Sequence, residues 1–137
     1  MRDFSVPATA AVAPEENLTD MVWANAERFG NAVSFRRQID GTWVDITARD
    51  FAAQVMAVAK GMIAAGIEHG DRIGLVSKTR YEWQLLDFAI WAAGGVTVPI
   101  YETSSADQIE WILSDSGAKA VFVETSAHRG SVDDVVG

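Results

Sequence analysis

The sequence predicts an α/β fold in which successive βαβ units build a mostly parallel sheet. Three short apolar runs, at residues 72–77, 96–100 and 120–124, alternate with longer segments of helical periodicity. Alternation of this kind favours parallel strands that helices cover on both faces. Residues that cap helices begin the helical segments and glycines end them, so the order of the elements can be followed along the chain.

An extended arm and a helix are expected first. Residues 1–16 contain Pro7 and Pro14 and read as an arm without regular structure. The helix that follows takes Thr19 as its N-cap and ends at Gly30. Four apolar residues fall on one face of it at helical spacing: Val22, Trp23, Ala26 and Phe29.

A β-hairpin is expected between this helix and the next one. Apolar and polar residues alternate on both sides of Asp40-Gly41. An Asp-Gly pair between two strand-like runs is a strong short-range hairpin signal.

The longest helix is predicted to begin at Thr47, with Asp50 as its capping-box partner, and to end at Gly66. Its main apolar face holds Phe51, Val55, Val58, Met62 and Ala65. The polar residues form only a narrow stripe of Asp50, Gln54 and Lys60. A stripe this narrow predicts a helix that is covered on more than one side.

The helix between the first two apolar runs is predicted over residues 80–93. Thr79 and Glu82 have the spacing of a capping box at its start, and Gly94-Gly95 stops it. Pro99 falls near the end of the strand that follows, where a missing N–H group is best tolerated.

A second helix of this kind follows the strand at 96–100. Ser105 and Gln108 predict its capping box, Gly117 closes it, and Ile109, Ile112 and Leu113 face inward. After the third strand, the tail to Gly137 reads as the opening of another helix.

The composition is that of an ordinary globular protein with an acidic balance: 49% hydrophobic residues, 22% charged residues and a net charge of -8. This charge disfavours nucleic acid as a partner, because phosphate binding needs clustered Lys and Arg. The absence of cysteine excludes disulfides and thiolate metal sites. We expect His69 and His128 to be solvated loop residues. We expect the tryptophans to lie in the core: Trp23, Trp43, Trp83, Trp91 and Trp111.

A cytoplasmic location is the expectation from the remaining bulk features. No apolar run reaches the roughly 18 to 20 residues that a membrane span needs. The short apolar stretch near the start is broken by prolines, unlike a signal peptide.

Ligands of open parallel α/β sheets bind outside the carboxyl ends of the strands. Three polar segments occupy such ends here: Ser77-Lys78-Thr79, Tyr101-Glu102-Thr103 and Glu124-Thr125-Ser126. Helix capping accounts for part of this polarity, at Ser105 and its neighbour Ser104 in particular. No phosphate-binding, nucleophile-elbow or zinc-protease motif occurs in the chain, and Glu82 and Asp87 are interpreted as surface carboxylates. The residues alone therefore predict a possible site that they do not complete.

The segment from 70 to 124 resembles the amino-terminal region of adenylate-forming enzymes, which include acyl-CoA synthetases, peptide-synthetase adenylation domains and luciferases. The resemblance is carried by Ala93-Gly94-Gly95 followed by Val98-Pro99. The continuation "IYETSSADQIEWILSDSGAK" is more narrowly similar to long-chain fatty acid–CoA ligases of the bacterial, actinobacterial type. The hairpin and long helix upstream also fit, so that the resemblance covers roughly residues 17 to 130.

The resemblance implies a partial amino-terminal domain of the acyl-CoA synthetase fold: an arm at 1–16 and, from 17 to 137, the first portion of an AMP-binding domain. It implies a longer ligase that uses ATP, Mg²⁺ and coenzyme A on a fatty acid. That ligase would include the remainder of the adenylation domain and a small C-terminal domain. Its membrane contact would be peripheral at most.

The resemblance assigns no catalytic, cofactor-binding or metal-binding residue to this chain. The family's Ser/Thr/Gly-rich loop ending in Pro-Lys-Gly, its Tyr-Gly-x-Thr-Glu motif, its ribose-binding aspartate and its catalytic lysine are all missing here. The chain is therefore expected to be scaffold and inactive by itself. The alternative is a free-standing small α/β module that binds a nucleotide or a partner protein.

Overall fold

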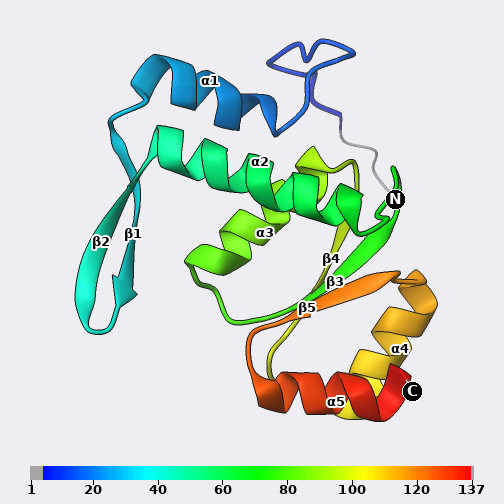
Figure 1. Cartoon of the computed structure of the whole chain (residues 1–137). Helices are drawn as coiled ribbons and strands as arrows, with labels where there is room; N and C mark the ends of the chain where they lie inside the picture. Colours follow the sequence, from blue (N-terminus) through cyan, green and yellow to red (C-terminus); the bar gives the residue numbers. More distant parts are fainter. Residues whose placement is uncertain (1–4, 137) are drawn as a thin grey trace.

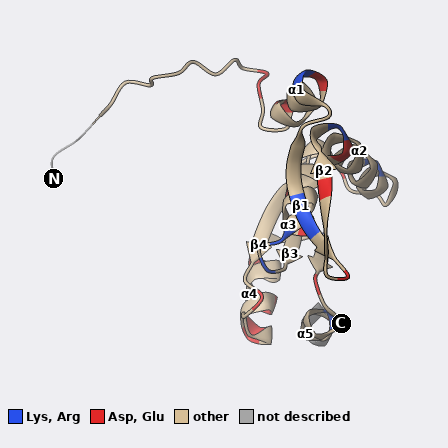
Figure 2. Ribbon diagram, turned by 90° about the vertical axis from the view of Figure 1, so that its left-hand side faces the viewer, with Lys and Arg blue, Asp and Glu red and all other residues tan. Residues whose placement is uncertain are grey.

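The computed structural model describes residues 5–136, and its elements follow the predicted order (Figure 1). Residues 5–16 are exposed and run away from the helices as an extended trace (Figure 2). The elements of the first half are α1 (Asp20–Phe29), β1 (Val33–Ile39), β2 (Thr42–Thr47) and α2 (Ala48–Ala64). Those of the second half are β3 (Arg72–Val76), α3 (Tyr81–Ala92), β4 (Val96–Ile100), α4 (Ala106–Ser116), β5 (Ala120–Val123) and α5 (Ser126–Val136).

The three strands of the second half form one parallel sheet in the order β4-β3-β5. The central strand β3 is buried over Ile73–Val76, whereas β4 and β5 are only partly covered. The predicted α/β class with βαβ connections is therefore confirmed. The hairpin of β1 and β2 forms a separate antiparallel pair.

Helices lie on both sides of the sheet, and each side has its own apolar core (Figure 1). On one side Ile73 packs with residues of α1, α2, α3 and the hairpin, including Val55, Phe51 and Ile90. On the other side Val76 and Ile100 pack with α4 and α5. Helix α2 contacts both α1 and α3, which confirms the expectation from its narrow polar stripe.

Most of the predicted starts and stops of the elements are confirmed. Asp40 and Gly41 both have positive φ, 48° and 79°, as a tight hairpin turn requires. The capping boxes of Thr47 with Asp50 and of Ser105 with Gln108 are both formed. Among the glycines expected to end helices, Gly66, Gly94 and Gly117 have positive φ.

The predicted capping box of Thr79 and Glu82 is wrong. Helix α3 takes Arg80 as its N-cap residue, and no side chain caps it. The Glu82 carboxylate is instead bound by two arginines, so it does not reach back to the helix start. The two ends of helix α1 also differ from the prediction. Thr19 occupies the N-cap position, but its side chain makes no capping hydrogen bond, and Gly30 keeps a right-handed helical conformation.

The expectation that every tryptophan lies in the core is also wrong. Trp43 and Trp111 are each 66% exposed, because Trp43 lies on the outward face of the hairpin and Trp111 on the outward face of α4. The interpretation of Asp87 as a surface carboxylate is wrong as well, because only 6% of this residue is exposed. His128 lies in helix α5 rather than in a loop, whereas His69 is an exposed loop residue as expected.

Candidate functional site at the carboxyl edge of the sheet

The three polar segments predicted as a site do follow strands that end at the same edge of the sheet. Val76, the last residue of β3, pairs with Ile100 at the end of β4 and with Val123 at the end of β5. The segments that follow these residues are therefore neighbours at one edge, although they behave differently from one another.

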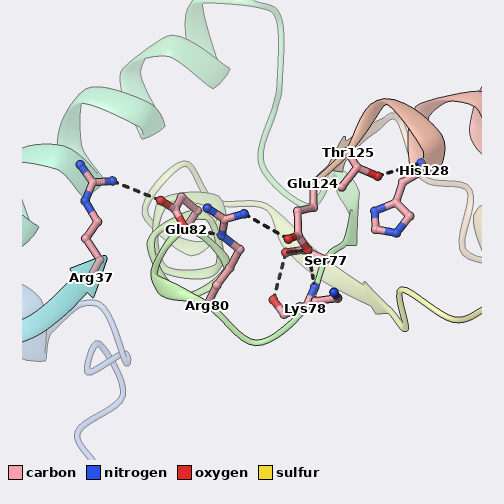
Figure 3. A network of polar contacts seen from close by, with 8 residues as sticks. All are labelled: Arg37, Ser77, Lys78, Arg80, Glu82, Glu124, Thr125 and His128. Carbon is pink, nitrogen blue, oxygen red and sulfur yellow. Dashed lines mark hydrogen bonds and ion pairs between the residues drawn. The ribbon is translucent and has the colours of Figure 1, made fainter. Parts of the chain in front are cut away.

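Glu124 joins the ends of β3 and β5 (Figure 3). Its Oε2 accepts a hydrogen bond from the Lys78 backbone N–H at 2.9 Å and lies 3.3 Å from the Ser77 hydroxyl. Its Oε1 pairs with Arg80 Nη1 at 3.1 Å. The side chain of Glu124 thus fixes the connection between β3 and α3 against the end of β5.

The same polar network continues from the sheet to the hairpin (Figure 3). Arg80 Nε donates to one oxygen of Glu82, and Arg37 Nη1 of strand β1 lies 3.2 Å from the other. The Arg37 guanidinium also stacks 5.1 Å from the centre of the Tyr81 ring. Arginine and carboxylate therefore alternate from Arg37 to Glu124, across parts of the chain that are remote in sequence.

These contacts keep both carboxylates ionised. The Lys78 backbone N–H is the main cause of the lowered pKa of Glu124, with Arg80 and Ser77 adding to it. Burial raises the pKa of Glu82, but hydrogen bonds and charge from Arg80 and Arg37 outweigh it, and the net pKa is lowered. Glu82 in turn raises the pKa of Arg80. Carboxylates with lowered pKa values suit a structural role, because a general acid or base must exchange its proton near neutral pH.

A small hollow lies beside the network. It has a volume of about 210 Å³ and is lined by Leu75, Ser77, Arg80, Glu82, Leu86, Phe122, Val123 and Glu124. Pockets that enclose a small-molecule ligand usually measure roughly 300–1,000 Å³. The hollow is therefore too small to be a complete ligand site within this chain.

The end of β4 does not join the network. Tyr101 is 82% exposed and borders a separate open groove of about 580 Å³ that includes Trp111. Ser105 is engaged in its helix cap, as the capping interpretation predicted. In the third segment, Thr125 accepts a hydrogen bond from the backbone N–H of His128 at the start of α5.

Neither a metal site nor a phosphate site is built from these residues. Within residues 5–136, no group of three His, Cys, Asp or Glu side chains could hold a metal ion. The sequence contains none of the glycine-rich loops that cradle phosphates. Sequence reasoning missed Arg37 and Arg80 as members of the network, and no local signal connects Arg37 with Glu82 across 45 residues.

Comparison with known proteins identifies the family of this chain. The family model described as AMP-binding enzyme matches residues 22–136. The chain belongs to this family. No helix in the part of the chain that the structure describes has the length and apolarity needed to cross a membrane.

A curated relative within the AMP-binding family is the long-chain-fatty-acid–CoA ligase FadD15 of Mycobacterium bovis (strain ATCC BAA-935 / AF2122/97). It is 47% identical over 137 residues, which are 100% of this chain and 23% of the relative. The chain thus spans about a quarter of the length of the curated relatives that match all of it.

Solved structures of the family confirm the fold. The N-terminal domain of FACL13 from Mycobacterium tuberculosis, solved with an inhibitor, superposes with a TM-score of 0.74 at 27% identity, over 86% of this chain and 29% of that chain. A Mycobacterium tuberculosis fatty acyl CoA synthetase gives a TM-score of 0.76 at 26% identity, over 88% of this chain and 24% of that chain. The expected acyl-CoA synthetase fold is therefore shown.

Proposed function

We propose that this chain is the amino-terminal scaffold of an ATP-dependent long-chain fatty acid–CoA ligase. The observation that carries the proposal is the 47% identity to mycobacterial FadD15 along the whole chain. The ligase joins a fatty acid to ATP as an acyl-adenylate with release of pyrophosphate. The thiol of coenzyme A then displaces AMP, giving acyl-CoA.

The residues of this chain do not fit the role of binding ATP, Mg²⁺ or coenzyme A by themselves. Glu82 and Glu124 are already paired with arginines or backbone donors, and the hollow beside them is small. We therefore assign no chemical step to them. The substrate and cofactors belong, in this proposal, to a longer protein that works in the cytoplasm, touches membranes at most peripherally and binds no nucleic acid.

The contribution of the chain is mechanical. The network from Arg37 to Glu124 fixes the hairpin and the start of α3 against the carboxyl edge of the sheet. In α/β sheets this edge borders the ligand site. The remainder of the adenylation domain and the small C-terminal domain would complete the site there.

A chimeric ligase tests the proposal. The matching quarter of M. bovis FadD15 is replaced by this chain, and acyl-CoA formation is measured with a long-chain fatty acid, ATP, Mg²⁺ and coenzyme A. We expect activity in the chimera and no pyrophosphate release above a heat-treated control from the 137-residue chain alone.

Two results would contradict the proposal. A chimera that folds, as judged by a cooperative melting transition, but forms no acyl-CoA would argue against the ligase assignment. Turnover by the isolated chain would argue against its role as scaffold and favour a self-contained module.

A further inference from the structure

Strand β5 forms an open edge of the sheet. Among the strands that the structure describes, it pairs only with β3. The Lys119 N–H donates to the Arg72 carbonyl at 2.8 Å. Because backbone groups alternate along a strand, those of Val121 also face β3, whereas those of Ala120 and Phe122 point outward. The outward groups are therefore placed to pair with another strand.

The β5 edge carries none of the devices by which proteins protect an exposed strand. Its residues, Ala120–Val123, include no proline and no charged side chain, whereas the β4 edge contains Pro99. All of them are partly exposed, although their side chains pack into both apolar cores. Strand β3, which has a neighbour on each side, is buried from Ile73 to Val76. The remaining exposure of β5 is what a further strand would cover.

The helices show on which face of the sheet the chain crosses from strand to strand (Figure 1). From β3 to β4 it crosses through α3, on the face of Ile73. From β4 to β5 it travels in the opposite direction, past β3, and crosses through α4 on the face of Val76. Connections between parallel strands are right-handed in about 98% of cases. A constant hand requires that a reversal of direction change the face, and the two connections obey this requirement.

Helix α5 begins a third connection. It follows β5 and packs against α4, and its Val132 belongs to the same core as Val76 and Leu113. Helix α5 therefore lies on the same face of the sheet as α4. The same hand on the same face requires the same direction of travel, which is away from β4. The first position reached in that direction is the free edge of β5.

We propose that the β5 edge binds, in parallel, the strand that follows α5 in the longer ligase. The inference rests on the proposed function, since the 23% coverage of FadD15 leaves most of that ligase to supply the strand. The strand carries apolar side chains on both faces, because it extends a sheet that helices cover on both sides. Its carboxyl end lies beside Glu124, so the segment after it is the next contribution of the ligase to the edge where ligands bind.

Amide hydrogen exchange in the FadD15 chimera tests whether the edge is paired. We expect the N–H groups of Ala120 and Phe122 to exchange as slowly as that of Val121, which faces β3 and is the control within the same strand. The comparison is the 137-residue chain, diluted until light scattering gives a monomer. There Ala120 and Phe122 should exchange at least about tenfold faster than Val121, because exchange follows the local cost of opening.

A second measurement identifies the strand. The chain is extended past Gly137 by the FadD15 residues that follow the matching quarter, in steps of about ten residues. A loop and a strand together take about 10–15 residues, so protection of Ala120 and Phe122 should appear by the second step. Ala120→Pro removes an outward N–H group. It should lower the urea midpoint of the extended chain by more than that of the 137-residue chain, whereas a purely local effect of proline would lower both equally.

The outcomes separate this inference from the proposed function. An active chimera in which Ala120 and Phe122 exchange freely while Val121 is protected overturns the pairing and leaves the ligase assignment intact. An inactive chimera argues against the ligase assignment, while its exchange pattern still reports on the edge. Protection in the chimera that no extension of up to about 30 residues reproduces would mean that another segment covers β5, and it would overturn the choice of strand.

Discussion

Gly94 and Gly95 stand next to each other in the chain but resist substitution for different reasons. Gly94 has a φ of 81°, a conformation that other residues adopt at a cost. Gly95 has an ordinary conformation, but an added Cβ would lie 2.7 Å from Ile73 Cδ1 and 3.2 Å from the Asp71 carbonyl oxygen. Backbone conformation therefore selects the first glycine, and close packing of α3 on β3 selects the second.

We expect Gly94→Ala and Gly95→Ala each to lower the free energy of unfolding by about 1 kcal/mol or more. Urea titration of the isolated chain measures the change. Gly61→Ala in helix α2 is the matched control, because a Cβ there meets no atom within 4 Å. It should stabilise the chain by roughly 0.5–1 kcal/mol. If Gly94→Ala or Gly95→Ala were neutral, the corresponding reason for glycine would be wrong.

The helices show that the same start signal can be realised or overridden. The Ser105 hydroxyl accepts a hydrogen bond from the Gln108 backbone N–H, and the Ser105 backbone N–H donates one to Gln108 Oε1. Thr79 and Glu82 have the same spacing, yet Glu82 binds Arg37 and Arg80 instead. The difference follows from two charged partners, the sequence neighbour Arg80 and the remote Arg37, because a hydrogen bond to a guanidinium is stronger than one to a backbone N–H.

Ser105→Ala should therefore lower the free energy of unfolding by about 1 kcal/mol, the usual cost of losing an N-cap side chain. Thr79→Ala should change it by less than about 0.5 kcal/mol, as expected for an exposed residue without a capping role. Both are measured by urea titration at the same pH. Equal losses at the two positions would mean that Thr79 does cap α3 in solution.

At the scale of the whole molecule, the sheet formed by the described residues 5–136 has two unpaired edges, β4 and β5, that differ in kind. The β4 edge is interrupted by Pro99, which cannot donate a hydrogen bond. The β5 edge consists of Ala120–Val123, all of them only partly buried and without a proline. Unprotected edges pair with other chains, so β5 is the more reactive edge.

The isolated chain is therefore expected to self-associate despite its net charge of -8. Light scattering over a dilution series should give a mass above 14.8 kDa at high concentration, and more so at raised salt, which screens the repulsion. A chain without residues 1–16 tests whether the arm takes part by crossing to a neighbour. A mass of 14.8 kDa at every concentration would favour a self-contained module.

Much of the candidate site lay beyond sequence reasoning for a physical reason. The polar residues at the strand ends could be located, because parallel βαβ units bring the carboxyl ends of their strands together. The contact between Arg37 and Glu82 could not be predicted, because it joins residues 45 positions apart. The burial of Asp87 was missed for the same reason, since it depends on how α3 meets β4 rather than on the pattern within α3.

The sequence by itself determined the α/β class, the order of the elements, the Asp40-Gly41 turn and two of the three predicted capping boxes. These features depend on periodicity and on interactions between residues a few positions apart, which the local sequence specifies. Only the tertiary structure decided the strand order β4-β3-β5, the exposure of Trp43 and Trp111, and the partners of Glu82 and Asp87. Each of these depends on which surfaces meet when the elements pack, and the local sequence pattern does not specify that choice.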